Sequence, residues 1–206
     1  MENPIRSSPL IIFLAFALYG AVHSLLASIP AKDLAYTFFG KAAERTYRLF
    51  YNIFSFITLL PILALRFILP DVELYTIPEP WSFIAKGGQI LALVLLAYSA
   101  VQTGIFKFIG FSQLMGINNE EKLNTRGLYR YLRHPLYTFS LVFLWLTPTM
   151  TRNLAILYLS FTMYFIIGAF VEERKLVKTF GDEYLEYISK TPFFIPFLKW
   201  GKKEEE

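Results

Sequence analysis

Residues 125–137 read TRGLYRYLRHPLY, and this stretch places three arginines and a histidine directly before a long apolar segment. The apolar segment, residues 136–171, carries a single charged residue, Arg152, and is interrupted by Thr147-Pro148-Thr149. It is too long for one ordinary membrane span, and proline breaks helices, so we expect two helices that turn near Pro148. The basic stretch therefore marks a membrane boundary at which a helical hairpin starts.

The composition is typical of a membrane protein. Of 206 residues, 55% are hydrophobic and 17% are charged, and the charges fall mainly between the apolar runs. We predict an all-α integral membrane protein with about five transmembrane helices, forming a single domain over residues 1–206. A cytoplasmic loop at 110–135 and a C-terminal segment at 172–200, which contains an amphipathic helix, complete this prediction. The expected spans are residues 10–28, 49–69, 89–109, 134–148 and 153–171.

The first apolar run is either a membrane span or a cleavable signal peptide, because small residues follow it. Its length and the polar pair His23-Ser24 inside it favour the span. An ionisable residue at membrane depth is a candidate functional residue, although a packed, hydrogen-bonded histidine is the commoner case. His23 therefore joins the candidates for a site.

Lysine and arginine are unevenly distributed among the connections. Residues 30–48 hold four, residues 110–135 hold four and the chain from residue 172 onward holds seven, whereas the N-terminal segment, residues 70–88 and the hairpin tip hold one each. Because basic loops stay in the cytoplasm, we expect the N-terminus outside and the C-terminus inside the cytoplasmic membrane of a prokaryote. The arginines of residues 125–137 are then either topology signals alone or part of a site.

Several classes of site are excluded. The chain has no cysteine, so it has no disulfide, no thiolate metal site and no cysteine nucleophile. Its two histidines, His23 and His134, are too few for a histidine-rich centre, and we expect no metal. The net charge of +4 is spread over loops between apolar segments, so we expect membrane lipids and no nucleic acid as partners. The oligomeric state does not follow from any of these features.

Two motifs together resemble a known superfamily. The first is Arg-His-Pro-Leu-Tyr at residues 133–137, and the second is Glu172-Glu173-Arg174-x-Leu176-x3-Phe180-Gly181-Asp182-x-Tyr184-x2-Tyr187-x4-Pro192. They resemble the isoprenylcysteine carboxyl methyltransferase and phospholipid methyltransferase superfamily. A third string, His23-Ser24-Leu25-Leu26-Ala27-Ser28 with Glu44-Arg45-x-Tyr47-Arg48, is similar to the methanethiol S-methyltransferase branch and to a nitric-oxide-reduction-associated membrane family.

The resemblance implies that the chain binds S-adenosylmethionine, transfers its methyl group and releases S-adenosylhomocysteine. Arginine suits the cofactor carboxylate, carboxylates suit its ammonium and ribose, and aromatic faces suit adenine or the sulfonium. The superfamily commonly has glycine where this chain has Phe139, a departure that narrows the cleft or alters helix packing. The expected catalytic residues are Arg133, His134 and Glu173. The expected cofactor-binding residues are Arg126, Tyr129, Arg133, His134, Pro135, Tyr137, Glu172, Glu173, Tyr184 and Tyr187.

The methyl acceptor that the resemblance favours is a small or membrane-partitioned thiol, with His23 and Arg45 as expected substrate residues. A thiol attacks as the thiolate, so either Arg133 or Arg126 has to lower its pKa, or one of His134, Glu172 and Glu173 has to accept its proton. A prenyl-cysteine carboxylate and a phospholipid amine stay open as acceptors. A membrane accessory or transport protein is the non-enzyme alternative, against which stands the lack of paired broken helices and mid-span acids.

Overall fold

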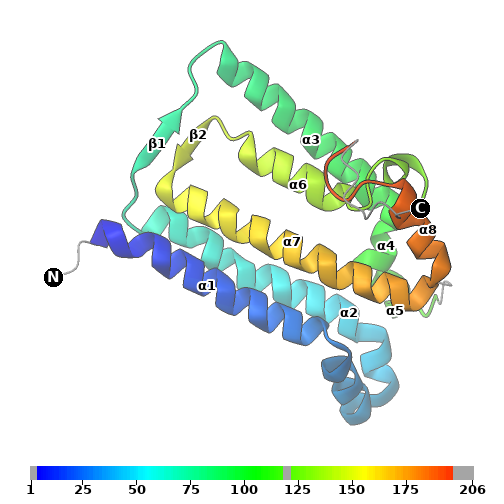
Figure 1. Ribbon diagram of the computed structural model, residues 1–206. Helices are drawn as coiled ribbons and strands as arrows, with labels where there is room; N and C mark the ends of the chain where they lie inside the picture. Colours follow the sequence, from blue (N-terminus) through cyan, green and yellow to red (C-terminus); the bar gives the residue numbers. More distant parts are fainter. Residues whose placement is uncertain (1–3, 118–121, 197–206) are drawn as a thin grey trace, which may run out of the picture. The chain divides into compact units, whose positions relative to one another are not determined.

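The computed structural model describes residues 4–117 and 122–196, with side chains from Ser7 onward. The chain is helical apart from one two-stranded sheet (Figure 1), and its elements group into two compact units. Unit 1 comprises residues 4–77, 104–117 and 149–161; unit 2 comprises residues 78–103, 122–148 and 162–196. The elements are α1 (Pro4–Ala27), α2 (Ile29–Ile68), β1 (Glu73–Thr76), α3 (Trp81–Thr103), α4 (Ile105–Phe108), α5 (Phe111–Leu114), the 3-10 helix η1 (Gly127–Arg130), α6 (Pro135–Trp145), β2 (Thr149–Thr151), α7 (Arg152–Phe180) and α8 (Asp182–Lys190).

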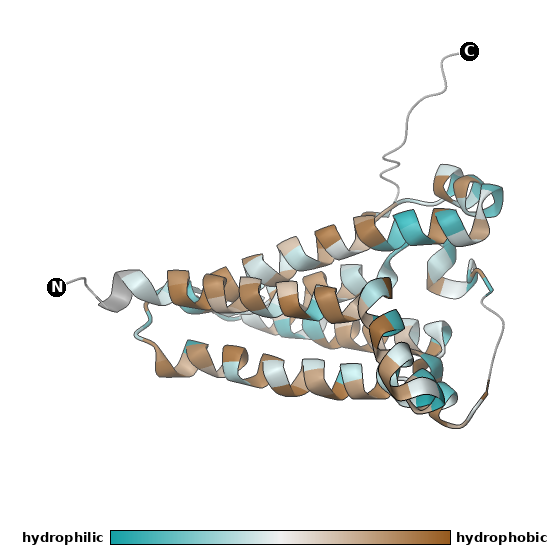
Figure 2. Ribbon diagram, turned by 90° about the horizontal axis from the view of Figure 1, so that it is seen from below, coloured by the Kyte–Doolittle hydropathy of each residue, from teal (hydrophilic) through white to brown (hydrophobic). Residues whose placement is uncertain are grey.

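Four helices are long and apolar enough to cross a membrane, within the part of the chain that the structure describes. They are Ser7–Ala27 of α1, and α2, α3 and α7. Figure 2 shows apolar residues over much of the long helices, with hydrophilic residues gathered toward some of their ends. The predicted span at residues 134–148 corresponds to α6, which has 11 residues. That helix is too short to cross the hydrocarbon layer by itself, so the multi-pass prediction is confirmed at the level of four long spans.

The boundaries of two expected spans differ from the structure. Residues 30–48, expected as a loop before the span at 49–69, are helical and belong to α2. Ser28 begins this helix as its N-cap by accepting a hydrogen bond from the Ala31 N–H at 3.3 Å, and Gly40 bends it with a φ of +54°. The span expected at 89–109 begins earlier, at Trp81, and ends before Gly104, which has a φ of +81°.

The connection at residues 70–88 contains β1, which pairs with β2 of the hairpin tip to form an antiparallel two-stranded sheet in unit 1. The prediction of an all-α chain missed this pair because each strand is too short to show the alternation of apolar and polar residues that is typical of a strand. Beside it, Asp71 Oδ1 accepts a hydrogen bond from the Asn153 N–H at 2.9 Å. The buried Asn153 Nδ2 donates to the Leu69 and Pro70 carbonyls, at 3.3 and 3.2 Å. These contacts anchor the start of α7.

In unit 2, α3 packs along α6, as Figure 1 also shows. Gln89 Nε2 donates to the Phe143 carbonyl at 2.9 Å, which joins the two helices. The amphipathic helix expected from residue 172 is divided: α7 continues to Phe180, Gly181 breaks it with a φ of +54°, and α8 follows. The predicted interfacial anchor at Trp200 lies outside the described residues.

Candidate active site

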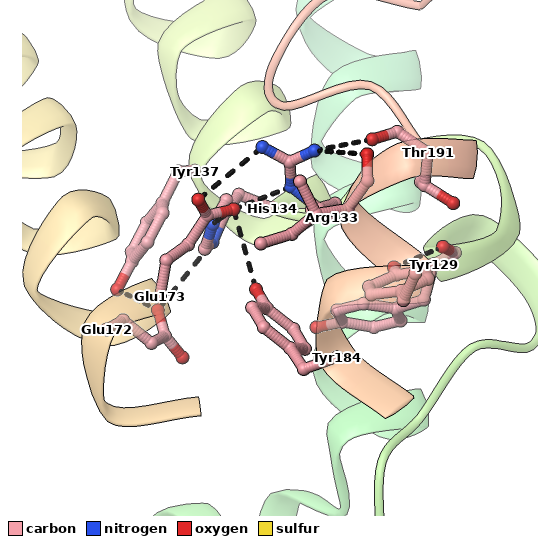
Figure 3. Close-up of polar contacts among 10 residues, drawn as sticks. Tyr129, Arg133, His134, Tyr137, Glu172, Glu173, Tyr184 and Thr191 are labelled. Carbon is pink, nitrogen blue, oxygen red and sulfur yellow. Dashed lines mark hydrogen bonds and ion pairs between the residues drawn. The ribbon is translucent and has the colours of Figure 1, made fainter. Parts of the chain in front are cut away.

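The two superfamily motifs meet in unit 2. Arg133 precedes α6, and its side chain is 5% exposed; Glu173 lies near the end of α7, and its side chain is 14% exposed. Arg133 Nε donates to Glu173 Oε1 at 2.6 Å, and Nη2 donates to Oε2 at 3.4 Å (Figure 3). The structure thus joins two charged residues that stand 40 positions apart. This fork geometry is the strong form of an arginine–carboxylate contact.

The rest of the Arg133 guanidinium binds the chain itself. Nη1 donates to the Ile188 carbonyl at 3.1 Å and to the Thr191 carbonyl at 2.7 Å. The backbone N–H of Arg133 donates to the Pro192 carbonyl at 2.9 Å. Four of the five guanidinium N–H groups are therefore engaged. These contacts hold Glu173 and the end of α8 in place.

His134 lies between two carboxylates. Its Nε2 is 3.2 Å from Glu173 Oε1, and its Nδ1 is 3.7 Å from Glu172 Oε2. The ring stacks on Tyr137 with a centroid separation of 5.5 Å, and its side chain is 4% exposed. The backbone of His134 is non-helical because a proline follows, and Pro135 begins α6. The motif Arg-His-Pro therefore places the imidazole at a helix start, directed at the end of α7.

The two glutamates have different surroundings. The Glu172 side chain is 47% exposed and accepts a hydrogen bond from the Tyr137 hydroxyl at 3.0 Å. The more buried Glu173 also accepts a long hydrogen bond, 3.4 Å, from the Tyr184 hydroxyl. Burial and the neighbouring Glu173 charge raise the pKa of Tyr184, so this hydroxyl stays protonated and acts as a donor. Glu172 is thus the accessible carboxylate and Glu173 the enclosed one.

Two further tyrosines from the predicted set hold η1 in place. The Tyr187 hydroxyl donates to the Tyr129 carbonyl, and the Tyr129 hydroxyl is 2.7 Å from Thr103 Oγ1. Burial raises the pKa of both phenols. Gln102, which sequence reasoning missed, accepts from the Leu128 N–H at 3.1 Å. Tyr187 thus links α8 to η1, and Tyr129 links η1 to α3.

Arg126 and Phe139 take no part in the contacts described above for Arg133, His134 and the two glutamates. Arg126 is exposed at the start of η1, and Phe139 is half-buried on α6. Within residues 4–117 and 122–196, no group of three or more histidine, aspartate or glutamate side chains is arranged to hold a metal ion.

A polar cavity of about 460 Å³ lies between α8 and the segment that leads to η1. Two lining residues also contact the motif residues Arg133, His134, Glu173 and Tyr184, here called the Arg133 cluster. The Thr191 carbonyl accepts from Arg133, and the rings of Tyr187 and Tyr184 have a centroid separation of 5.8 Å. Sequence reasoning did not select its charged residues, because they lie outside the two motifs or at the variable positions within them. The lining residues are Leu123, Thr125, Arg130, Glu183, Glu186, Tyr187, Lys190 and Thr191.

His23 lies in unit 1, between α1 and α2. Its Nδ1 is 2.8 Å from Ser55 Oγ, and its Nε2 is 2.5 Å from the Tyr51 hydroxyl. It borders a mainly apolar cavity of about 290 Å³, whose lining includes Leu18, Val22 and Phe54. Arg45 is exposed on α2 and does not line this cavity.

Comparison with known proteins shows a similarity to one family. The model of the family described as "Phospholipid methyltransferase" matches residues 84–183, which include Arg133, His134, Tyr137 and both glutamates. The matched residues, just under half of the chain, are similar to the phospholipid methyltransferase family. The predicted resemblance is thereby confirmed, and unit 2 holds most of the matched phospholipid methyltransferase region.

Curated relatives extend the similarity over most of the chain. Methanethiol S-methyltransferase 1 of Bradyrhizobium diazoefficiens is 27% identical over 196 residues, covering 92% of this chain and 67% of the relative. Methanethiol S-methyltransferase of Crocosphaera subtropica is 31% identical over 135 residues, covering 60% of this chain and 52% of the relative. Protein-S-isoprenylcysteine O-methyltransferase B of Arabidopsis thaliana is 34% identical over 94 residues, covering 43% of this chain and 47% of the relative.

The chain therefore spans two thirds of the first relative and about half of the other two. It is homologous to methyltransferases, as the sequence motifs predict. No solved structure matches the chain.

Proposed function

We propose that the chain is an S-adenosylmethionine-dependent integral membrane methyltransferase that S-methylates a small or membrane-partitioned thiol. The observation that carries this proposal is the direct contact of Arg133 and His134 with Glu173, which joins the two methyltransferase motifs. The names of the methanethiol S-methyltransferase relatives support the thiol as acceptor.

The residues of unit 2 fit such a cofactor. Bound S-adenosylmethionine supplies an electrophilic methyl group on a cationic sulfonium, together with an amino acid, a ribose and an adenine. The accessible Glu172 suits ribose hydroxyls or an ammonium group, and the aromatic ring of Tyr137 suits adenine or the sulfonium. Arg133 contributes by positioning Glu173. We keep the other residues of the predicted set as cofactor-binding candidates: Arg126, Tyr129, His134, Pro135, Glu173, Tyr184 and Tyr187.

His134 is the proposed base. Glu173 is a carboxylate paired with Arg133, so it only accepts hydrogen bonds, and Nε2 of the imidazole has to carry the proton between them. The neutral ring then has its lone pair on Nδ1, 3.7 Å from Glu172 Oε2. Nδ1 takes the thiol proton, and Glu172 stabilises the resulting imidazolium. The thiolate that remains is the reactive nucleophile.

Orientation and exclusion of water complete the contribution of the chain. The His134 ring is enclosed by Tyr137, Phe193 and Phe194, with centroid separations of 5.0 to 5.7 Å. A dry, ordered environment strengthens the electrostatic contacts and lowers the entropic cost of aligning two reactants.

A lipid-like acceptor is the second candidate. It would be an isoprenylcysteine carboxylate or a phospholipid amine; the name of the Arabidopsis relative contains isoprenylcysteine, and the description of the family model contains phospholipid. The apolar cavity beside His23 favours it, because about 290 Å³ is much larger than a thiol of two heavy atoms needs. His23 and Arg45 remain substrate candidates, with His23 better placed. A membrane accessory or transport role has no supporting observation among the described residues.

The proposed topology has five spans in a single functional domain, with α6 completing the fifth crossing together with its flanking residues. The excess of basic residues in 110–135 and after 172 supports a cytoplasmic C-terminus and an external N-terminus in a prokaryotic cytoplasmic membrane. The Arg133 cluster then lies where a soluble cofactor reaches it.

The test is a binding titration followed by an acceptor screen. Detergent-purified protein is titrated calorimetrically with S-adenosylhomocysteine, then incubated with methyl-labelled cofactor and an alkanethiol, a prenyl-cysteine or phosphatidylethanolamine. We expect label in the thiol, and loss of transfer in His134→Gln. Label in the prenyl-cysteine or the phospholipid alone would select the second candidate. Failure of the wild-type protein to bind S-adenosylhomocysteine would refute both.

A further inference from the structure

Arg133 has few N–H groups left with which to bind the amino acid end of a ligand. The cofactor of the proposed function carries a free carboxylate and a free ammonium on its amino acid end, and arginine is the usual partner of such a carboxylate. Arg133 already places four of its five N–H groups on Glu173 and on two backbone carbonyls. Arg133 therefore has at most one N–H group left for the carboxylate, and a second cation is the favoured partner.

Two cations face the cavity beside α8. Arg130, at the end of η1, and Lys190, in the last turn of α8, both line it. Two carboxylates, Glu183 and Glu186, line the same cavity. The formal charges balance, so the cavity suits a ligand that carries one group of each sign rather than a simple anion.

The size and position of the cavity agree with this ligand. About 460 Å³ is within the range of small-molecule sites. Tyr187 and Thr191 line the cavity, and the carbonyl of Thr191 accepts from Arg133. The cavity therefore borders the cluster that the two motifs form.

Two of the charged lining residues, Lys190 and Glu186, form a weak ion pair with each other. Lys190 Nζ forms an ion pair with Glu186 Oε1 on the surface of α8, and both side chains are about two thirds exposed, at 68% and 66%. Exposed ion pairs of this kind contribute little to stability. A ligand can therefore exchange this pair for its own contacts at small cost.

We propose that the cavity between α8 and η1 binds the amino acid end of the methyl donor, with Arg130 and Lys190 on its carboxylate and Glu183 and Glu186 on its ammonium. This inference rests on the proposed function and adds four residues that neither motif-based reasoning nor the family match assigns. It makes Arg133 a positioning residue and Arg130 the direct anion contact.

The experiment compares two ligands that differ only at this end. S-adenosylhomocysteine has the amino acid group, whereas 5′-methylthioadenosine has the same nucleoside and thioether without it. Binding of both to the detergent-purified full chain is measured by calorimetry. Arg130→Gln should weaken S-adenosylhomocysteine binding about tenfold, the equivalent of one charged hydrogen bond, and should leave 5′-methylthioadenosine unchanged. Glu183→Gln should also weaken S-adenosylhomocysteine binding and leave 5′-methylthioadenosine binding unchanged, because it removes a carboxylate that contacts the ligand ammonium.

Matched controls come from exposed neighbours that do not line the cavity. Lys175→Gln on α7 removes one positive charge, and Asp182→Asn on α8 removes one negative charge. Neither should change the affinity for either ligand. Because Arg130 and Glu183 are exposed, their variants should also unfold at the wild-type denaturant concentration.

Three outcomes overturn the inference while leaving the proposed function standing. They are wild-type affinity of Arg130→Gln for S-adenosylhomocysteine, an equal loss for both ligands, and an effect of the controls as large as that of the cavity variants. Absence of binding of both ligands to the wild-type protein would instead refute the proposed function itself.

Discussion

Replacing Arg133 by glutamine tests whether this arginine holds unit 2 together. The substitution removes the charge that pairs with Glu173 at 2.6 Å, and it removes the donors for the carbonyls of Ile188 and Thr191. The structure therefore predicts a loss of folding stability that is independent of any ligand.

The size of this loss follows from the burial of the pair. Breaking a buried ion pair costs about 3–5 kcal/mol. Glu173 keeps His134 as a partner, and its side chain is 14% exposed, so we expect the lower end, about 3 kcal/mol. Glu173→Gln, which leaves the arginine charge uncompensated, should cost about the same. The double variant places two neutral amides opposite each other and should cost about 4 kcal/mol, a coupling of about 2 kcal/mol.

Unfolding with sodium dodecyl sulfate in mixed micelles measures these energies. Tryptophan fluorescence is a suitable signal because Trp145 lies at the end of α6 and donates to Thr162 Oγ1 at 3.0 Å in unit 2. Arg174→Gln, an exposed neighbour on α7, is the control and should stay within about 0.5 kcal/mol of wild type. Strictly additive costs for the two single variants, or an Arg133→Gln protein as stable as the control, would show that the pair does not support the fold.

Three further predictions address other parts of the molecule. Tyr137→Phe removes the hydrogen bond to the exposed Glu172 carboxylate and should weaken S-adenosylhomocysteine binding about fivefold by calorimetry; an unchanged affinity would remove this tyrosine from the site. Tyr184 has a pKa raised above the ordinary 10.0, so above about pH 10 the unfolded chain loses a proton that the folded chain keeps, and stability falls by up to about 1.4 kcal/mol per pH unit. Tyr184→Phe should make this alkaline decline shallower, whereas the exposed Tyr131→Phe should not; equal slopes in a pH series of unfolding curves would contradict the assignment. Gly110 has a φ of +92°, and a Cβ there would lie 2.6 Å from the Leu49 backbone nitrogen, so Gly110→Ala should cost about 3 kcal/mol. Gly116→Ala, with a φ of +71° and open space, should cost about 1 kcal/mol, and equal costs would exclude the close approach.

The family and the two motifs were accessible from the sequence because they depend on residue identity along the chain. Membrane insertion was accessible as well, because the length of an apolar run decides whether a helix reaches across the hydrocarbon layer. Helix ends were less accessible: residues 30–48 carry charges and were expected as a loop, yet they continue α2. The pairing of β1 with β2 joins residues more than 70 positions apart and has no local signal.

The hydrogen-bond partners of individual polar residues were decided only by the tertiary structure. Arginine, histidine and glutamate side chains were expected to share a site, and unit 2 brings them together. Whether Arg133 faces a ligand or the chain itself depends on carbonyls that lie 55 and 58 positions away, and no motif encodes that distance. The same holds for Arg130 and Lys190, whose common cavity exists only because Gly181 turns α8 back beside η1. Hydrophobicity and motif chemistry act locally and can be read along the chain, whereas hydrogen-bond partners are chosen by the path of the folded backbone.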